Sequence, residues 1–245
     1  MPAPSLEQLI ADIVAANRIL ANENIVDAFG HVSVRHPQDP GKFLLSRARS
    51  PELIEAEDIM VLALDGTPEP GDTRKPYLER FIHGAIYEAR PEVMSVVHSH
   101  SRSVIPFGLV GEPIRPVIHS SGTLGYEVPL WDTQTKFGDT NLLVGSMAMG
   151  RDMALTMGSG NGVLMRGHGS TVCGRSIQEA VYTAYYLEVN ANLQLQAARL
   201  GPNPVKYLTK GEVDGIISRI SDGLPGEGFS RAWDYWCRRA GIADC

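Results

Sequence analysis

Two histidines separated by a single residue offer the clearest chemistry in this chain. His98-Ser99-His100 follows the apolar run of residues 94–97, and that run predicts a short β-strand. Side chains two residues apart in a strand project to the same side, so both imidazoles can face one point. Such a pair can chelate a divalent cation, although an isolated His-x-His pattern also occurs by chance.

A third imidazole stands far along the chain, at His168, just after the apolar run 163–165. Gly167 and Gly169 flank it, and glycines permit another part of the backbone to approach closely. Glu79 supplies a carboxylate near the start of the helix expected before the His98 strand. Three neutral imidazoles and a carboxylate suit Zn, Mn, Fe or Co, and they leave room for a substrate oxygen. We therefore predict a divalent metal site made by Glu79, His98, His100 and His168.

The remaining histidines carry weaker signals. His36 stands beside Pro37 in a turn-like stretch, which favours a solvated loop position. His83 lies one helical turn after Glu79, so it either supports that carboxylate or packs in the core. The sequence does not decide a role for His119.

Elements predicted from the hydrophobic pattern place these residues. Ser5 and Gln8 form a capping-box pattern at the start of an amphipathic helix that ends near residues 22–24. The alternating stretch 30–35 predicts a strand, and residues 42–45 are its expected hairpin partner. Residues 60–64 predict a further strand, closed by a turn signal.

Two helices are expected on either side of the histidine motifs. Pro76 suits the first turn of one helix, in which Leu78 and Phe81 begin a buried stripe that stops at Arg90. Ser176 opens a long second helix that ends at Gly201. The class is α/β, and no repeat or linker justifies a cut, so we expect one domain over residues 1–245.

Bulk properties exclude several classes of protein. The 245 residues carry a formal net charge of -6 without a Lys/Arg run longer than a pair, which argues against nucleic-acid binding. The first residues lack a signal-peptide pattern and no apolar stretch approaches a membrane span, so a cytoplasmic protein without membrane contact is expected. Cys173, Cys237 and Cys245 are odd in number and widely spaced, which favours reduced thiols.

Four ordered motifs carry a resemblance to a known family. They are Gly30-His31-Val32-Ser33-Val34-Arg35, Glu79-Arg80-Phe81-Ile82-His83, Arg90-Pro91 through His98-Ser99-His100, and Gly167-His168-Gly169. With them the chain resembles the class II aldolase/adducin family, related to L-fuculose-phosphate aldolase, as far as about residue 200. The resemblance implies one αβα domain with a central, mainly antiparallel sheet, here with residues 205–245 as a C-terminal extension. It also implies metal binding by the three histidines, Glu79 as a ligand or proton-transfer group, and a homotetramer or higher assembly with active sites between subunits.

Departures from the sugar-phosphate aldolases bear on the substrate. The places of their phosphate-binding residues are taken here by His31, Ser46, Arg47, Arg49 and Tyr77. Arginine pairs bidentately with carboxylates and stacks on rings, so these groups suit a small, flat anionic substrate. We assign a catalytic or binding role to His31, because an unperturbed histidine can titrate near neutrality, and substrate binding to the other four.

This pattern is similar to a decarboxylase branch of the family, which includes 3-hydroxy-2-methylpyridine-4,5-dicarboxylate decarboxylase and 3,4-dihydroxyphthalate decarboxylase. The expected function is non-oxidative decarboxylation of a hydroxylated aromatic or pyridine dicarboxylate through a metal-stabilised oxyanion. His31 or Glu79 would then return a proton to the ring.

Other functions stay open at this point. One is an aldolase or epimerase acting on a sugar phosphate, with Arg49 holding the phosphate. Another is an adducin-like interaction module without catalysis, and a third is a non-haem iron oxygenase on the same scaffold. The aromatic stretch of residues 229–236 either packs on its own domain or a neighbouring subunit, or reaches the substrate.

Overall fold

A seven-stranded sheet forms the centre of the molecule in the computed structural model, which describes residues 4–222 and 227–243. The strand order is β3-β2-β1-β4-β7-β6-β5, and every neighbouring pair is antiparallel except β5 with β6. The strands are β1 (His31–Arg35), β2 (Lys42–Ser46), β3 (Ile59–Ala63), β4 (Ser95–Ser99), β5 (Leu130–Trp131), β6 (Gly162–Met165) and β7 (Gly169–Gly174). The expected mainly antiparallel α/β fold is confirmed.

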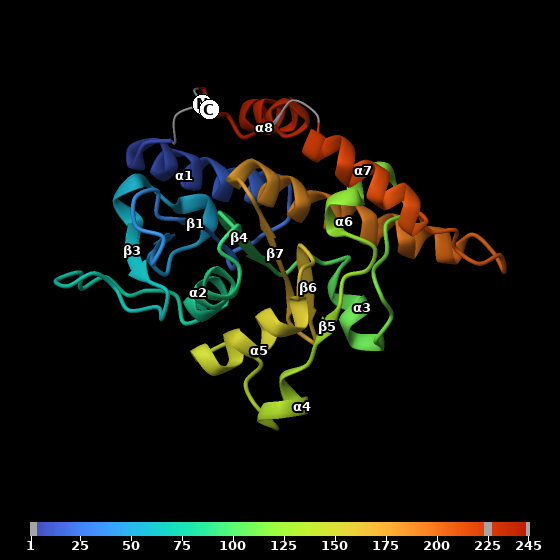
Figure 1. The fold of residues 1–245 in the computed structure, drawn as a ribbon, viewed down its shortest axis with the longest axis horizontal. Coiled ribbons are helices and arrows are strands. Elements are labelled where there is room, and N and C mark those ends of the chain that lie inside the picture. Colours follow the sequence, from blue (N-terminus) through green and yellow to red (C-terminus); the bar gives the residue numbers. More distant parts are fainter. Residues whose placement is uncertain (1–3, 223–226, 244–245) are drawn as a thin grey trace.

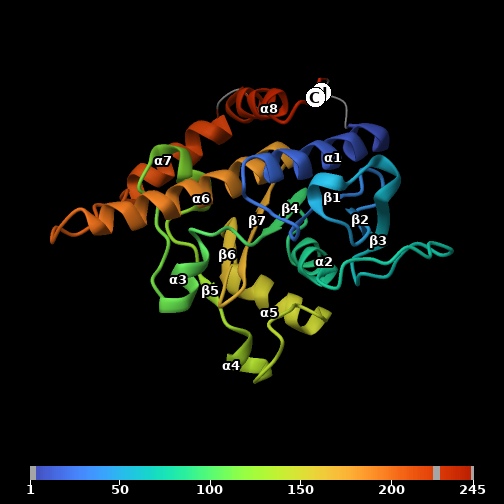
Figure 2. The same cartoon turned by 180° about the vertical axis from the view of Figure 1, so that it is seen from behind.

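Helices cover both faces of this sheet (Figures 1 and 2). The α-helices are α1 (Leu6–Asn22), α2 (Arg80–Ala89), α3 (Ile105–Val110), α4 (Thr133–Phe137), α5 (Met147–Met157), α6 (Ile177–Arg199), α7 (Lys210–Asp222) and α8 (Glu227–Arg239). Short 3-10 helices are η1 (Pro51–Leu53), η2 (Ala56–Asp58) and η3 (His119–Leu124). Helices α1 and α6 lie on one face with α8 packed outside them, whereas α2 and α5 lie together on the other face.

Strand alternation divides the interior into two apolar clusters. Val32 and Val97 face the α1 and α6 side, where they join the larger cluster. Val96 faces the α2 and α5 side and joins the second cluster. His98, two residues after Val96, therefore projects toward α2, and so does His31, its register partner on β1.

Most of the predicted elements are confirmed, because their end signals act as expected. Ser5 accepts a hydrogen bond from the Gln8 backbone N–H at 3.1 Å, and Ser176 accepts one from the Glu179 N–H at 3.1 Å. These caps open α1 and α6 at the predicted places. Strands β1 and β2 pair as the expected hairpin.

The predicted start of the helix at Pro76 is wrong. Helix α2 begins at Arg80 with Glu79 at its N-cap position, and Pro76 instead forms a β-bridge with Arg47. Leu78, expected in the buried stripe, is 50% exposed because it precedes the helix. Pro76 therefore lies alongside the end of β2, and Leu78 and Glu79 form the turn that leads into α2.

The expectation of reduced thiols is confirmed at one position and wrong at another. Cys173 is a free, buried cysteine on β7, whereas Cys237 on α8 is disulfide-bonded. Cys245 lies outside the described residues. The odd count and wide spacing did not reveal this bond, since pairing depends on where the chain brings two cysteines together.

Among the helices in the described ranges, none has the length and apolar character needed to span a membrane. The segment assigned to a C-terminal extension contains α7 and α8, and its boundary at residue 205 stays a prediction.

Candidate metal centre and active site

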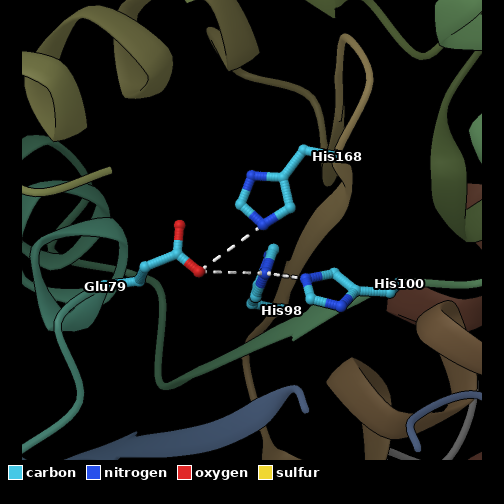
Figure 3. Close-up of side chains that lie close together, drawn as sticks. All are labelled: Glu79, His98, His100 and His168. Atoms are coloured by element: carbon cyan, nitrogen blue, oxygen red, sulfur yellow. Dashed lines mark hydrogen bonds and ion pairs between the residues drawn. The ribbon is translucent and has the colours of Figure 1, made fainter. Parts of the chain in front are cut away.

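Four side chains from three separate parts of the chain meet on the α2 side of the sheet (Figure 3). Glu79 comes from the N-cap of α2, His98 from β4, His100 from just beyond β4, and His168 from the turn before β7. One potential ligand atom from each lies within 4.8 Å of all the others. The structure thus brings together the residues predicted as metal ligands.

Close contact between β4 and the turn before β7 allows His168 to meet the pair on β4. A Cβ added to Gly169 would lie 2.2 Å from the Ser99 carbonyl oxygen, so no larger residue fits without a backbone shift. Gly167 adopts φ of 65°, a left-handed conformation that favours glycine. The close approach expected from the flanking glycines is confirmed.

Backbone carbonyls orient two of the imidazoles. The Nδ1–H of His98 donates to the Ser170 carbonyl at 3.1 Å, and the Nδ1–H of His168 donates to the Leu142 carbonyl at 3.0 Å. A neutral imidazole protonated at Nδ1 has its lone pair on Nε2, which is the form that binds metals. Both Nε2 atoms accordingly present lone pairs to the cluster.

Contacts inside the cluster leave imidazole nitrogens without suitable donors. The Nε2 atoms of His98 and His100 are 3.2 Å apart, and Nε2 of His168 is buried without a hydrogen-bond partner in the described structure. Buried acceptors facing one another are unfavourable unless a shared cation or proton lies between them. This donor set therefore fits a divalent cation of the Zn, Mn, Fe or Co type.

Glu79 completes the set as an ionised carboxylate. Its Oε1 accepts a hydrogen bond from the Val144 N–H at 2.9 Å, while Oε2 lies 3.7 Å from His98 Nε2 and 3.5 Å from His168 Nε2. Burial raises the pKa of Glu79, but the two imidazoles and the Val144 N–H outweigh burial and hold this pKa at about 2. Burial lowers the pKa of His98 and of His100, which favours neutral, ligating imidazoles.

His31 lies at the border of the cluster. Its ring centroid is 5.0 Å from that of His98 and 4.6 Å from that of Tyr77. Nδ1 of His31 is 2.6 Å from Nε2 of His83, so its position is fixed from α2. The predicted catalytic histidine is therefore adjacent to the predicted metal ligands.

The predicted arginines follow β2, and their guanidinium groups both turn to one carboxylate. Arg47 Nε lies 2.5 Å from Asp58 Oδ1, and Arg49 Nη1 lies 2.6 Å from Asp58 Oδ2. Tyr77 donates its hydroxyl hydrogen to the Arg49 carbonyl. The Arg49 backbone therefore lies next to Tyr77, whose ring in turn lies against that of His31. Ser46, the last residue of β2, is buried. The Arg49 main chain thus contacts Tyr77, whose ring lies against His31, whereas both guanidinium groups pair with Asp58.

Asp58 was not expected from the sequence. Burial raises the pKa of its carboxyl group, but the Glu55 backbone N–H and the two guanidinium groups outweigh burial and hold this pKa at about 2. Its buried carboxylate therefore stays ionised and orders the loop after β2. Asp58 is one of four acidic residues in the stretch 52–58, and nothing in the local sequence distinguishes it from Glu52, Glu55 and Glu57.

Ser33 and Tyr87 were also missed, and His83 was left undecided. All three are buried on the α2 side of the sheet and form a hydrogen-bonded chain that reaches His31. The alternation of His31, Ser33 and Arg35 on one face of β1 is the signal that could have indicated a polar face. The sequence does not say which helix covers that face.

Fold and cluster together define a class of protein, an α/β scaffold that holds buried imidazoles and a carboxylate around one point. A model of the class II aldolase and adducin N-terminal domain matches residues 11–195. The chain belongs to the class II aldolase and adducin family.

Named relatives extend this result over nearly the whole chain. The chain is 34% identical to decarboxylase tropJ of Talaromyces stipitatus, covering 94% of this chain and 92% of that protein. It is also 34% identical to 3,4-dihydroxyphthalate decarboxylase of a Terrabacter species, covering 96% of each. A solved L-fuculose 1-phosphate aldolase from Glaciozyma antarctica is 25% identical and superposes with a TM-score of 0.76, covering 96% of this chain and 89% of that one. The expected resemblance is confirmed, and the chain is an enzyme, a carbon-carbon lyase.

Proposed function

We propose that this enzyme is a metal-dependent, non-oxidative decarboxylase of a hydroxylated aromatic or pyridine dicarboxylate. The observation that carries the proposal is the buried cluster of one carboxylate and three imidazoles, in a chain 34% identical to two named decarboxylases. One of these relatives is named for a dihydroxyphthalate, a flat dianion. Tyr77, whose ring lies against His31, and the two arginines after β2 are groups that suit such a substrate.

His98, His100 and His168 would hold the cation, and Glu79 would be its fourth ligand or a proton-transfer group. When bound, a divalent cation acts as a Lewis acid that lowers the energy of negative charge developing on a substrate oxygen. The protein's own contribution is to orient the ligands, because Ser170 and Leu142 carbonyls fix two imidazoles before any metal arrives.

His31 is the proposed proton donor to the ring carbon that loses its carboxylate. Its ring lies against the rings of Tyr77 and of His98, one of the residues that would hold the metal. Burial lowers the pKa of His31, so this neutral imidazole must receive a proton as it gives one up. Glu79 is the second candidate, and its ionised carboxylate likewise has no proton to give until one is delivered to it.

Arg47 and Arg49 are proposed to bind a substrate carboxylate. Both guanidinium groups keep partly exposed surfaces, 40% and 30% of the side chains, while Asp58 holds their inner edges. A guanidinium has five N–H donors, so pairing with Asp58 leaves donors for a second carboxylate. Ser46 and Tyr77 would line the same side of the substrate.

A comparison of products tests the proposal against its rivals. We expect the purified protein to release carbon dioxide from hydroxylated aromatic or pyridine dicarboxylates, and to lose this activity on chelation and regain it with a divalent metal. Full activity after complete metal removal would contradict the mechanism. Release of dihydroxyacetone phosphate from ketose phosphates would favour the aldolase function, and oxygen uptake would favour the oxygenase. A protein that contains no metal and has none of these activities would favour the interaction module.

We also propose that the enzyme assembles as a homotetramer with sites between subunits. Phe29, whose ring lies 6.3 Å from that of His100, is 65% exposed, and Leu78 beside Glu79 is 50% exposed. Exposed apolar side chains next to a site suit contact with a neighbouring copy. Light scattering of the purified protein tests this, because a monomeric species with full activity would contradict it.

A further inference from the structure

A chain of buried polar side chains runs from His31 away from the metal cluster. His31 Nδ1 is 2.6 Å from His83 Nε2, and His83 Nδ1 is 2.6 Å from Ser33 Oγ. Ser33 Oγ is in turn 2.7 Å from the Tyr87 hydroxyl. The largest exposed fraction among these four residues is 3%, so water does not compete for their hydrogen bonds.

Strand β1 and helix α2 hold these four hydrogen-bonded side chains in a single arrangement. His31 and Ser33 lie two residues apart on β1, and His83 and Tyr87 lie one turn apart on α2, so both pairs face each other. Phe43 on β2 packs beside them, with its ring centroid 6.3 Å from that of His83 and 5.5 Å from that of Tyr87. Because this packing fixes the side chains, only the positions of the hydrogens along the hydrogen bonds can still differ.

Tyr87, at the far end of this series of hydrogen bonds from His31, determines which group donates in each of them. Burial raises the pKa of the Tyr87 phenol, so this group keeps its hydrogen and must donate it. The Ser33 hydroxyl is the acceptor that the described part of the chain provides. Ser33 then has to donate its own hydrogen to His83 Nδ1, and neutral His83 carries its hydrogen on Nε2. His83 therefore donates to Nδ1 of His31.

We propose that Tyr87, Ser33 and His83 are positioning residues that fix neutral His31 as the tautomer with its hydrogen on Nε2. Within residues 4–222 and 227–243 no hydrogen-bond partner is found for that Nε2 atom, which lies across the ring from His83. His31 then presents an N–H donor, and not a lone pair, to a ligand between Tyr77 and the metal residues. The use of this donor toward a substrate oxygen or ring carbon rests on the proposed function.

Nitrogen NMR of the full-length, zinc-loaded protein with labelled histidine tests the tautomer without any turnover. We expect the His31 signals, assigned by their loss in His31→Gln, to show a protonated Nε2 and an unprotonated Nδ1. In Tyr87→Phe the phenol donor is absent, so both tautomers of His31 should be populated. A wild-type His31 protonated at Nδ1, or a tautomer unchanged in Tyr87→Phe, would overturn the proposal.

Two substitutions at His83 distinguish its hydrogen bond to His31 from its hydrogen bond to Ser33. The amide of Gln reaches the position of the His Nε2 atom, whereas the amide of Asn reaches that of Nδ1. His83→Gln should keep the donor to His31 and retain most of kcat, while His83→Asn should lose that donor and lower kcat by about 10-fold to 100-fold with KM nearly unchanged. Equal losses in both variants would indicate a structural role and would also overturn the proposal.

Phe43→Leu is the matched control for packing. It removes contacts to the same two rings without removing a hydrogen bond, so it should lower the melting temperature and leave the His31 tautomer unchanged. A protein with the expected tautomer that releases no carbon dioxide would contradict the proposed function and support this inference.

Discussion

Individual side chains of the candidate metal cluster are held by the protein itself in positions that suit metal binding. The Nδ1–H groups of His98 and His168 donate to backbone carbonyls, and Oε1 of Glu79 accepts from the Val144 N–H. His100 differs, since it lies beyond the end of β4 and is half-buried. It is therefore the ligand whose loss should disturb the fold least.

Replacing His100 by Ala is expected to remove the metal and the activity while the fold persists. The cluster would keep two imidazoles and a carboxylate, and a site that loses one of its few ligands binds a divalent cation far more weakly. Metal content by elemental analysis, read beside the melting temperature, checks this. His36→Asn is the control, because Asn keeps an acceptor for the Gln38 and Asp39 N–H groups that His36 Nδ1 serves. Stoichiometric metal in His100→Ala would contradict the ligand assignment.

Replacing Arg49 by Met should weaken substrate binding more than turnover. The guanidinium would be lost while the Arg49 carbonyl still accepts from Tyr77, so the backbone beside His31 stays in place. We expect KM for a dicarboxylate to rise about tenfold, with a smaller change in kcat. Arg151→Met, which breaks an exposed pair with Glu88, is the matched control and should leave KM unchanged. An unchanged KM in Arg49→Met would exclude this arginine from the substrate site.

The residue types and spacing predicted the cluster well and its surroundings poorly. His98 and His100 are paired by the two-residue period of a strand, which is a local property of the sequence. Asp58 forms a hydrogen bond with Arg49, which is 9 residues away in the sequence, and Tyr87 forms one with Ser33, which is 54 residues away. Such pairings depend on sheet order and helix placement, which no local pattern contains.

At the scale of elements, the contact between β4 and the start of β7 sets the geometry of the cluster. Gly169→Ala would place a Cβ against the Ser99 carbonyl and push the two strands apart beside His168. We expect metal affinity to fall at least about tenfold, and the free energy of unfolding to fall by roughly 1–3 kcal/mol, as for other overpacked sites. Metal titration and denaturant unfolding measure both quantities. Gly215→Ala on α7, where an added Cβ meets nothing within 4 Å, should leave metal affinity unchanged and raise the free energy of unfolding by about 1 kcal/mol or less, as expected for Gly→Ala in a helix.

The loop after β2 should respond to acid through Asp58. The pKa of this carboxyl group is about 2 in the folded protein, below its ordinary value of 3.8, because its hydrogen bonds and arginine partners outweigh burial. Its contribution to stability is thus fully present above that ordinary value and is lost as the pH falls toward 2. We expect Asp58→Asn to cost roughly 1–2 kcal/mol near neutral pH, and the difference from wild type to shrink as the pH falls below about 4.

Denaturant unfolding at several pH values measures that difference. Glu52→Gln, which removes an exposed carboxylate on η1, provides the control and should change stability little at any pH. A stability difference for Asp58→Asn that stayed constant from neutral pH to about pH 3 would show that the ion pairs contribute nothing through charge.

The element predictions succeeded where local signals were strong. Capping serines gave the starts of α1 and α6, and alternation gave β1 and β2. Strand β7 has small and polar residues, and its place in the sheet comes from pairing with β4 and β6 on either side. The start of α2 was misplaced because Pro76 is equally suited to the extended segment that bridges to Arg47.

For the molecule as a whole, the two faces of the sheet have different roles. The cluster, His31 and the polar chain lie on the α2 side, whereas α8 packs against α6 and α1 on the opposite side. Trp236 is buried there, with its ring 4.7 Å from that of Tyr185. Of the two expectations for the aromatic tail, packing on its own domain describes α8 in the structure.

Trp236→Ala should therefore lower stability without changing the chemistry. Removing a buried indole costs roughly 3–5 kcal/mol, while metal content and kcat per folded molecule should stay at wild-type values. Tyr235→Ala on the same helix, where the side chain is 58% exposed, should cost about 0.5 kcal/mol or less. Unfolding curves and metal analysis of both variants provide the measurement. A selective loss of kcat in a fully folded Trp236→Ala protein would instead place the tail in the reaction.

The separation of the two faces has a practical consequence for anyone who wishes to redesign this catalyst. A more stable variant can be sought by repacking the apolar residues around α1, α6 and α8, which lie on the face opposite the candidate site. A version for another substrate calls for work on the opposite face, at the proposed substrate-binding residues. Arg47 and Arg49 share the carboxylate of Asp58, so these two must be varied together, whereas Tyr77 bonds only the Arg49 backbone.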